Sequence, residues 1–109
     1  MVSGLLKFEK LGAVASFQFV LVYIEDTRRA GADATLVAEH RIDIPPNFDL
    51  ARDVLPFEFQ IDQTLDGLTV RAHMPAHDGR DIRSGDMITM GSFAASNSGN
   101  DVVILKSVR

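Results

Sequence analysis

The sequence predicts an all-β fold, a seven-stranded antiparallel β-sandwich formed by the whole chain. Apolar and polar residues alternate at a spacing of two in several short segments, which is typical of half-buried strands. Turn-forming residues separate these segments, and apolar residues almost nowhere recur at helical spacing. The 109 residues suffice for one domain with a buried core and are too few for two, so residues 1–109 are expected to fold as one unit.

Three expected strands fill the N-terminal half: residues 2–10, 14–25 and 36–44. The first alternates weakly and is interrupted by Gly4, and the second is rich in aromatic and β-branched side chains, which favour strands. In the third, Leu36, Ala38 and Ile42 are expected to face the core. Pro45-Pro46 then ends this strand, because proline has no N–H to donate to a ladder.

Four further strands are expected in the C-terminal half: residues 54–61, 67–74, 81–90 and 102–108. In the first of them Leu55, Phe57, Phe59 and Ile61 share a face, and Pro56 indicates a sheet edge. The second alternates strictly, with an apolar face made of Leu68, Val70, Ala72 and Met74. Asp78-Gly79 favours a tight hairpin turn after it, since both residues tolerate positive φ. Seven such strands indicate an immunoglobulin-like or transthyretin-like layout.

Composition excludes several functions. The net charge is −4 and the eleven Lys and Arg residues form no run, which argues against nucleic acid as a partner. The chain has no cysteine, so it can form neither a disulfide nor a thiolate site. It also has no apolar stretch of about 18 residues that could span a membrane, and no visible signal peptide. No catalytic or cofactor motif is found, so we expect no enzyme activity and no cofactor.

Short segments in a fixed order resemble the YbaY-like lipoproteins and the YscW-like pilotins of type III secretion. They run through most of the chain: Val2-Ser3-Gly4, Val22-Tyr23-Ile24-Glu25-Asp26, Ala32-Asp33-Ala34, Val37-Ala38-Glu39, Pro56-Phe57-Glu58-Phe59, Val70-Arg71-Ala72, Asp78-Gly79-Arg80 and Ser84-Gly85-Asp86. The order and spacing of these segments carry the resemblance. The sequence departs from the family at Arg83, where an apolar residue is usual, and in lacking the lipid-bearing cysteine.

The resemblance implies a small β-protein of the Gram-negative envelope without enzyme activity. Family members are attached to the outer membrane by a lipidated N-terminal Cys and face the periplasm, and the pilotins among them bind a secretin subunit. We therefore expect a protein partner, with a secretin as the candidate. The expected location is the periplasm or the outer membrane if a lipoprotein presequence has been trimmed, and the cytoplasm otherwise.

An alternative function is a periplasmic ligand or copper carrier. His73, His77, Met87 and Met90 lie on or beside the expected hairpin, and imidazole and thioether groups are ligands for copper. His73 and Met74 are neighbours in a strand and point to opposite faces, however, and Met74 is interpreted as a core residue together with Leu68 and Val70. The carboxylates Asp78, Asp81 and Asp86 are interpreted as turn residues.

The strand over residues 14–25 is apolar on both faces. If Val20, Val22 and Ile24 face the core, the other face carries Phe17, Phe19, Leu21 and Tyr23. An exposed row of this kind would bind a partner, and otherwise another part of the chain must cover it. The open edges of a sandwich offer a second route to association, so we also expect binding of a partner, or formation of a homodimer, through a strand edge.

Overall fold

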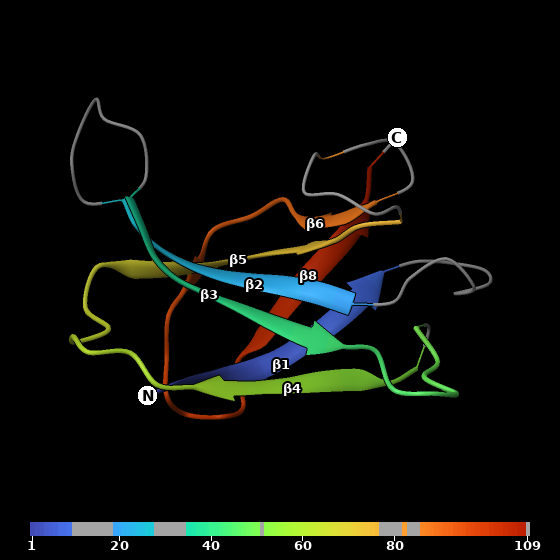
Figure 1. Ribbon diagram of the computed structural model, residues 1–109, viewed down its shortest axis with the longest axis horizontal. Coiled ribbons are helices and arrows are strands. Elements are labelled where there is room, and N and C mark those ends of the chain that lie inside the picture. Colours follow the sequence, from blue (N-terminus) through green and yellow to red (C-terminus); the bar gives the residue numbers. More distant parts are fainter. Residues whose placement is uncertain (10–18, 28–34, 51, 77–81, 83–85, 109) are drawn as a thin grey trace.

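The computed structural model describes the chain apart from residues 10–18, 28–34, 51, 77–81, 83–85 and 109 (Figure 1). The described residues form eight strands and no helix: β1 (Val2–Glu9), β2 (Phe19–Asp26), β3 (Thr35–Asp43), β4 (Val54–Phe59), β5 (Leu68–Met74), β6 (Met87–Thr89), β7 (Phe93–Ala94) and β8 (Val102–Ser107). The all-β prediction is confirmed. The additional strand is β7, which lies in the polar segment between the last two expected strands and pairs with β5.

The strands form one curled sheet, and the expected antiparallel sandwich is not what is seen. Along the sheet the order is β3-β2-β5-β6-β8-β1-β4, which makes a nearly closed barrel (Figure 1). The sheet is mixed, because β1 and β8 run parallel while the other neighbours run antiparallel. Parallel pairing of the first and last strands brings together residues about one hundred positions apart, such as Leu5 and Val102.

The barrel interior is filled by the side chains that alternation predicted. On β5 the predicted inner face is at most 3% exposed, and it consists of Leu68, Val70, Ala72 and Met74. Val20, Val22 and Ile24 on β2 are fully buried in the same core. On β4, Leu55 and Phe57 are buried and Pro56 is exposed, in agreement with the predicted face. This strand ends the sheet, as Pro56 indicated.

One local prediction is wrong. Leu36 was expected to face the core, but it is 53% exposed. A β-bulge shifts the β2–β3 register here, so that Ile24 pairs with Ala38 while the next residue, Glu25, pairs with Leu36. The antiparallel return of the chain after β5 is confirmed, since β5 pairs antiparallel with β6 and Met74 lies opposite Met87. Asp78-Gly79 itself lies outside the described residues.

Candidate partner-binding seam

The barrel is open between its two end strands. No ladder joins β3 to β4 among the described residues, and their Cα atoms mostly lie more than 8 Å apart. Paired strands lie about 4.8 Å apart, so β3 and β4 are too far apart along most of their length to share a ladder. We call the opening between residues 35–43 and residues 54–59 the β3–β4 seam (Figure 1).

Aromatic side chains close the seam from inside. The rings of His40 on β3 and Phe59 on β4 stack with their centroids 4.9 Å apart and their planes at 21°. His40 pairs in register with the buried Val22, so it lies on the inward side of β3. Phe59 also contacts Phe57, whose ring centroid lies 6.5 Å away. The seam therefore has an apolar floor although its two strands are not hydrogen-bonded to each other.

The β4 edge of the seam is interrupted by Pro56. Successive residues of an antiparallel strand turn their backbone groups alternately to one neighbour and the other. The N–H of Leu5 on β1 donates to the carbonyl oxygen of Asp101 at 2.8 Å, so the Leu5 backbone points away from β4. Pro56 is the residue opposite Leu5, and its backbone therefore points away from β1 toward the seam. A proline at this position offers the seam a carbonyl oxygen but no N–H.

The β3 edge presents both N–H and C=O groups to the seam. The N–H of Ala72 on β5 donates to the Thr89 hydroxyl at 3.2 Å, and this places the backbone of its partner Val22 toward β3. Val22 and His40 thus form a hydrogen-bonded pair of the β2–β3 ladder. By alternation the backbone groups of Arg41 and Asp43 point into the seam, where they have no backbone partner among the described residues.

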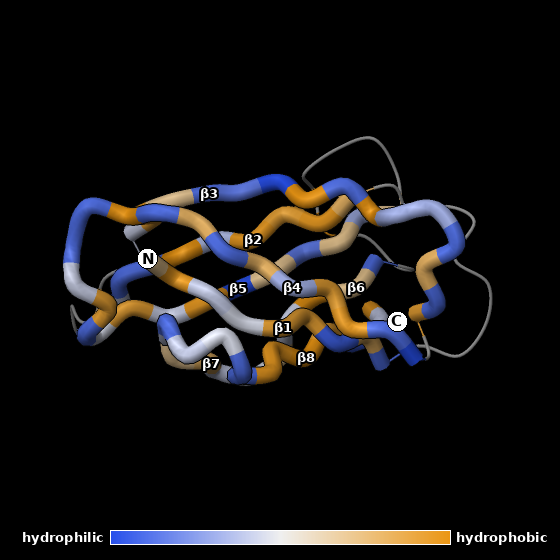
Figure 2. Tube along the Cα trace, turned by 90° about the horizontal axis from the view of Figure 1, so that it is seen from below, coloured by the Kyte–Doolittle hydropathy of each residue, from blue (hydrophilic) through white to orange (hydrophobic). Residues whose placement is uncertain are grey.

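A groove and a set of acidic side chains flank the seam. The groove has a volume of about 450 Å³ and is lined by Val37, Ala38, Gln60, Ile61, Asp62 and Gln63. Exposed carboxylates occur on both sides, at Glu39, Asp43, Glu58 and Asp62. Arg41 is the basic side chain of β3, and its Nε lies 3.1 Å from Asp43 Oδ1. Figure 2 shows hydrophilic residues along much of β3.

The apolar row on the outer face of β2 is mostly covered. Leu21 is 3% exposed and Tyr23 is 7% exposed, whereas Phe19 is half-buried. The Arg71 guanidinium lies 4.3 Å from the centre of the Tyr23 ring, and the Arg41 guanidinium lies 4.2 Å from the centre of the Phe19 ring. The row was expected either to bind a partner or to be covered by another part of the chain. Leu21 and Tyr23 are covered within the chain. Phe17 lies outside the described residues, and partner binding by the row stays a prediction.

The suggested copper ligands lie apart where they are described. Met87 is fully buried and pairs with Met74 inside the barrel, while His73 neighbours Met74 and points to the opposite face. Met90 is 55% exposed at a rim. His77 lies outside the described residues. Within the described ranges, no group of three or more His, Cys, Asp or Glu side chains could hold a metal ion.

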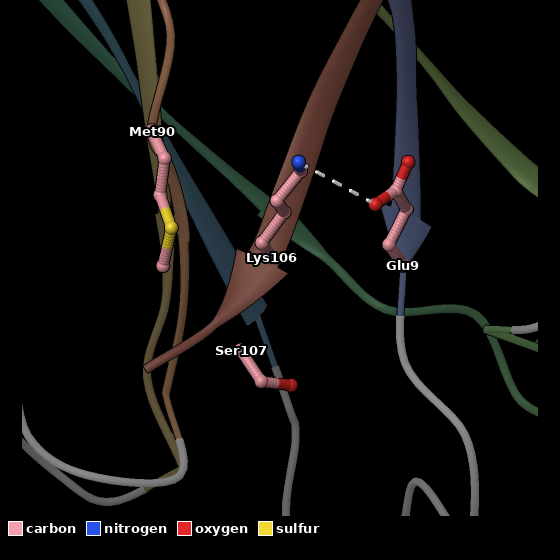
Figure 3. Close-up of a pocket in the computed structure, with 4 residues that line it drawn as sticks. All are labelled: Glu9, Met90, Lys106 and Ser107. Atoms are coloured by element: carbon pink, nitrogen blue, oxygen red, sulfur yellow. Dashed lines mark ion pairs between the residues drawn. The ribbon is translucent and has the colours of Figure 1, made fainter. Parts of the chain in front are cut away.

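Met90 lines a second hollow, at the other end of the barrel from the groove. Its other lining residues are Glu9, Lys106 and Ser107, from β1 and β8 (Figure 3). The Lys106 ammonium lies 3.9 Å from a Glu9 carboxylate oxygen, and both side chains are about half exposed. An exposed ion pair of this kind adds little stability, and the described residues of the hollow include no grouping of catalytic side chains.

A buried polar pair on the outer side of β5 was missed by sequence reasoning. His73 Nε2 lies 2.8 Å from Asp86 Oδ2, and the two side chains are 1% and 0% exposed. The other carboxylate oxygen, Oδ1, accepts a hydrogen bond from the Ala76 N–H at 2.8 Å. The hydrogen bonds of Asp86 therefore hold this residue, which lies just before β6, against His73 on β5 and against Ala76. The signal of the pair in the sequence is a histidine on the outer face of a strand followed by an aspartate thirteen residues later, which is weak.

Comparison with known proteins identifies a structural neighbour. No protein-family model and no curated protein matches the sequence. Among solved structures, the chain is similar to an alternative pilotin from the type II secretion system of Vibrio cholerae, with a TM-score of 0.64 and 18% sequence identity. The similarity covers 99% of this chain and 96% of that one. The chain therefore has a pilotin-like fold, and its membership of the YbaY-like or YscW-like families stays a prediction.

Proposed function

We propose that this chain is a non-enzymatic, pilotin-like assembly module of the bacterial envelope that binds a partner protein at the β3–β4 seam. The full-length similarity to a secretion pilotin and the YbaY-like and YscW-like sequence segments support the class. By that resemblance, the candidate partner is a secretin subunit and the location is the periplasmic face of the outer membrane. The observation that carries the proposal is the open seam, with its aromatic floor and adjoining groove.

The seam has the properties that a protein-binding site needs. Its floor provides apolar surface at His40 and Phe59, and burying apolar surface drives most protein association. Its edges provide backbone donors and acceptors that fix the orientation of a bound chain. The neighbouring groove can receive a side chain at Ile61, which is half-buried. Hot-spot residues of a partner typically occupy pockets of this kind.

Co-purification with a secretin subunit tests the proposal. The chain would be produced together with the secretin encoded in the same genome, and the fraction of secretin retained on the tagged chain would be measured. Asp62→Arg reverses a charge in the groove, whereas Glu9→Arg makes the same change at the second hollow. We expect Asp62→Arg to lower retention several-fold and Glu9→Arg to leave it unchanged. Absence of retention, or equal effects of the two variants, would contradict the proposal.

A further inference from the structure

We infer that the β3–β4 seam binds its partner as an added β-strand, and that this strand is an extended basic segment with alternating apolar residues. The inference rests on the proposed function and specifies the conformation and chemistry of the partner. It follows from the direction of the backbone groups at the two edges, the width of the seam and the charges around it.

The two edges differ in their ability to pair with a strand. At β3 the N–H and C=O groups of Arg41 and Asp43 both point into the seam, so an incoming strand can exchange two hydrogen bonds with each residue. At β4 the central position is Pro56, which can accept a bond but cannot donate one. The incoming strand therefore pairs fully with β3, and β4 contributes carbonyl acceptors along its other side.

The seam is suited to one strand rather than to a helix. The Cα atoms of β3 and β4 mostly lie more than 8 Å apart, yet side chains from the two strands still touch at His40 and Phe59. A strand placed between them needs about 4.8 Å on each side, whereas a helix with its side chains is about 10 Å wide. The stacked rings occupy part of the space between the two strands, and a strand needs less room there than a helix does.

Side chains of the added strand would alternate between two environments. Those pointing inward would meet the His40 and Phe59 rings and the half-buried Ile42, which favours apolar residues there. Those pointing outward would lie beside the exposed carboxylates of Glu58 and Asp62. Arg41 is ion-paired with Asp43 and lies over the Phe19 ring, so these two charges offset each other and the acidic character comes from Glu58 and Asp62. Lysine or arginine at alternate positions therefore complements these carboxylates.

A second copy of this chain fits the seam less well. Its own β3 is already paired with β2 along one edge, so it cannot lie between β3 and β4 of another barrel. An extended segment of a different protein has both edges free and can carry the complementary charge.

Selection from a library of random twelve-residue peptides, displayed on phage, tests this inference on the full chain. We expect the enriched peptides to alternate apolar residues with Lys or Arg at a spacing of two. Arg41→Pro is the critical variant, because the Arg41 N–H points into the seam and is not part of the β2–β3 ladder. Arg41→Ala is the matched control, since it removes the same side chain and keeps the N–H.

Synthetic versions of the enriched peptides would then be titrated against the three proteins. We expect Arg41→Pro to weaken binding at least tenfold and Arg41→Ala to bind as well as the original chain. Enrichment of peptides with apolar residues at helical spacing, equal binding to both variants, or no enrichment at all would overturn the inference. Dimerisation of the chain that Arg41→Pro abolishes would also overturn it, in favour of a second copy. If a secretin is retained equally by Arg41→Pro and Arg41→Ala, strand addition fails while the proposed function stands.

Discussion

Replacement of Asp86 by alanine should be among the most damaging single changes in this protein. The carboxylate is fully buried and serves two donors, His73 Nε2 and the Ala76 N–H, each at 2.8 Å. Removing the carboxylate leaves both donors without this acceptor at a site that is buried from water. A buried donor left unsatisfied costs about 1–3 kcal/mol. The expected loss is therefore about 2–6 kcal/mol, against a total stability of roughly 5–15 kcal/mol for a domain.

Urea unfolding followed by circular dichroism measures this loss at neutral pH. Glu58→Ala removes an exposed carboxylate and should change the free energy of unfolding by less than about 0.5 kcal/mol. The double variant with His73→Ala isolates the coupling between the two buried side chains, which we expect to be about 1–3 kcal/mol. A loss below about 1 kcal/mol for Asp86→Ala, or no coupling to His73, would refute the role of the pair in holding the β5–β6 connection.

Three further changes test the packing and the edges. Gly4→Ala would place a Cβ 2.8 Å from Phe57 Cζ and 2.9 Å from a backbone carbonyl oxygen. We expect the free energy of unfolding, measured in urea, to fall by about 1–3 kcal/mol. An unchanged urea midpoint would contradict this close approach. Val70→Asp puts a carboxylate into the core and should cost several kcal/mol, whereas Thr69→Asp on the opposite face should cost about 1 kcal/mol because a carboxylate lies across from it. Equal urea midpoints for these two variants would show that the faces of the strand are assigned wrongly. Pro56→Ala restores an N–H at the β4 edge, and we expect this variant to self-associate at high protein concentration in sedimentation velocity. A purely monomeric variant would show that Pro56 does not protect this edge from pairing with another chain.

The sequence predicted the inner faces well because alternation is a local property. Each side chain on β5 needs only its immediate neighbours to show which face it occupies, and the strictly alternating run Leu68–Met74 was placed correctly. Pro56 likewise placed β4 at an edge, since a missing N–H constrains that position whatever surrounds it. Leu36 was misplaced because the bulge beside it depends on pairing with β2.

The closure of the sheet and the candidate site depend on contacts between distant segments. Nothing near Leu5 or Val102 indicates that these residues run parallel to each other, and their pairing is what makes the sheet mixed. The seam arises because β3 and β4 happen to be the two ends of the strand order, which alternation cannot reveal. The stack of His40 on Phe59 follows from that same arrangement.

Amide hydrogen exchange tests partner binding at the seam most directly. Exchange at individual residues would be measured by NMR on the chain alone and on the chain bound to the secretin segment or to a selected peptide. The account predicts that the Arg41 and Asp43 amides, which point into the seam, exchange at least tenfold more slowly in the complex, while amides at the hollow formed by Glu9 and Lys106 do not change. Unchanged exchange at Arg41 and Asp43 in a saturated complex would contradict it.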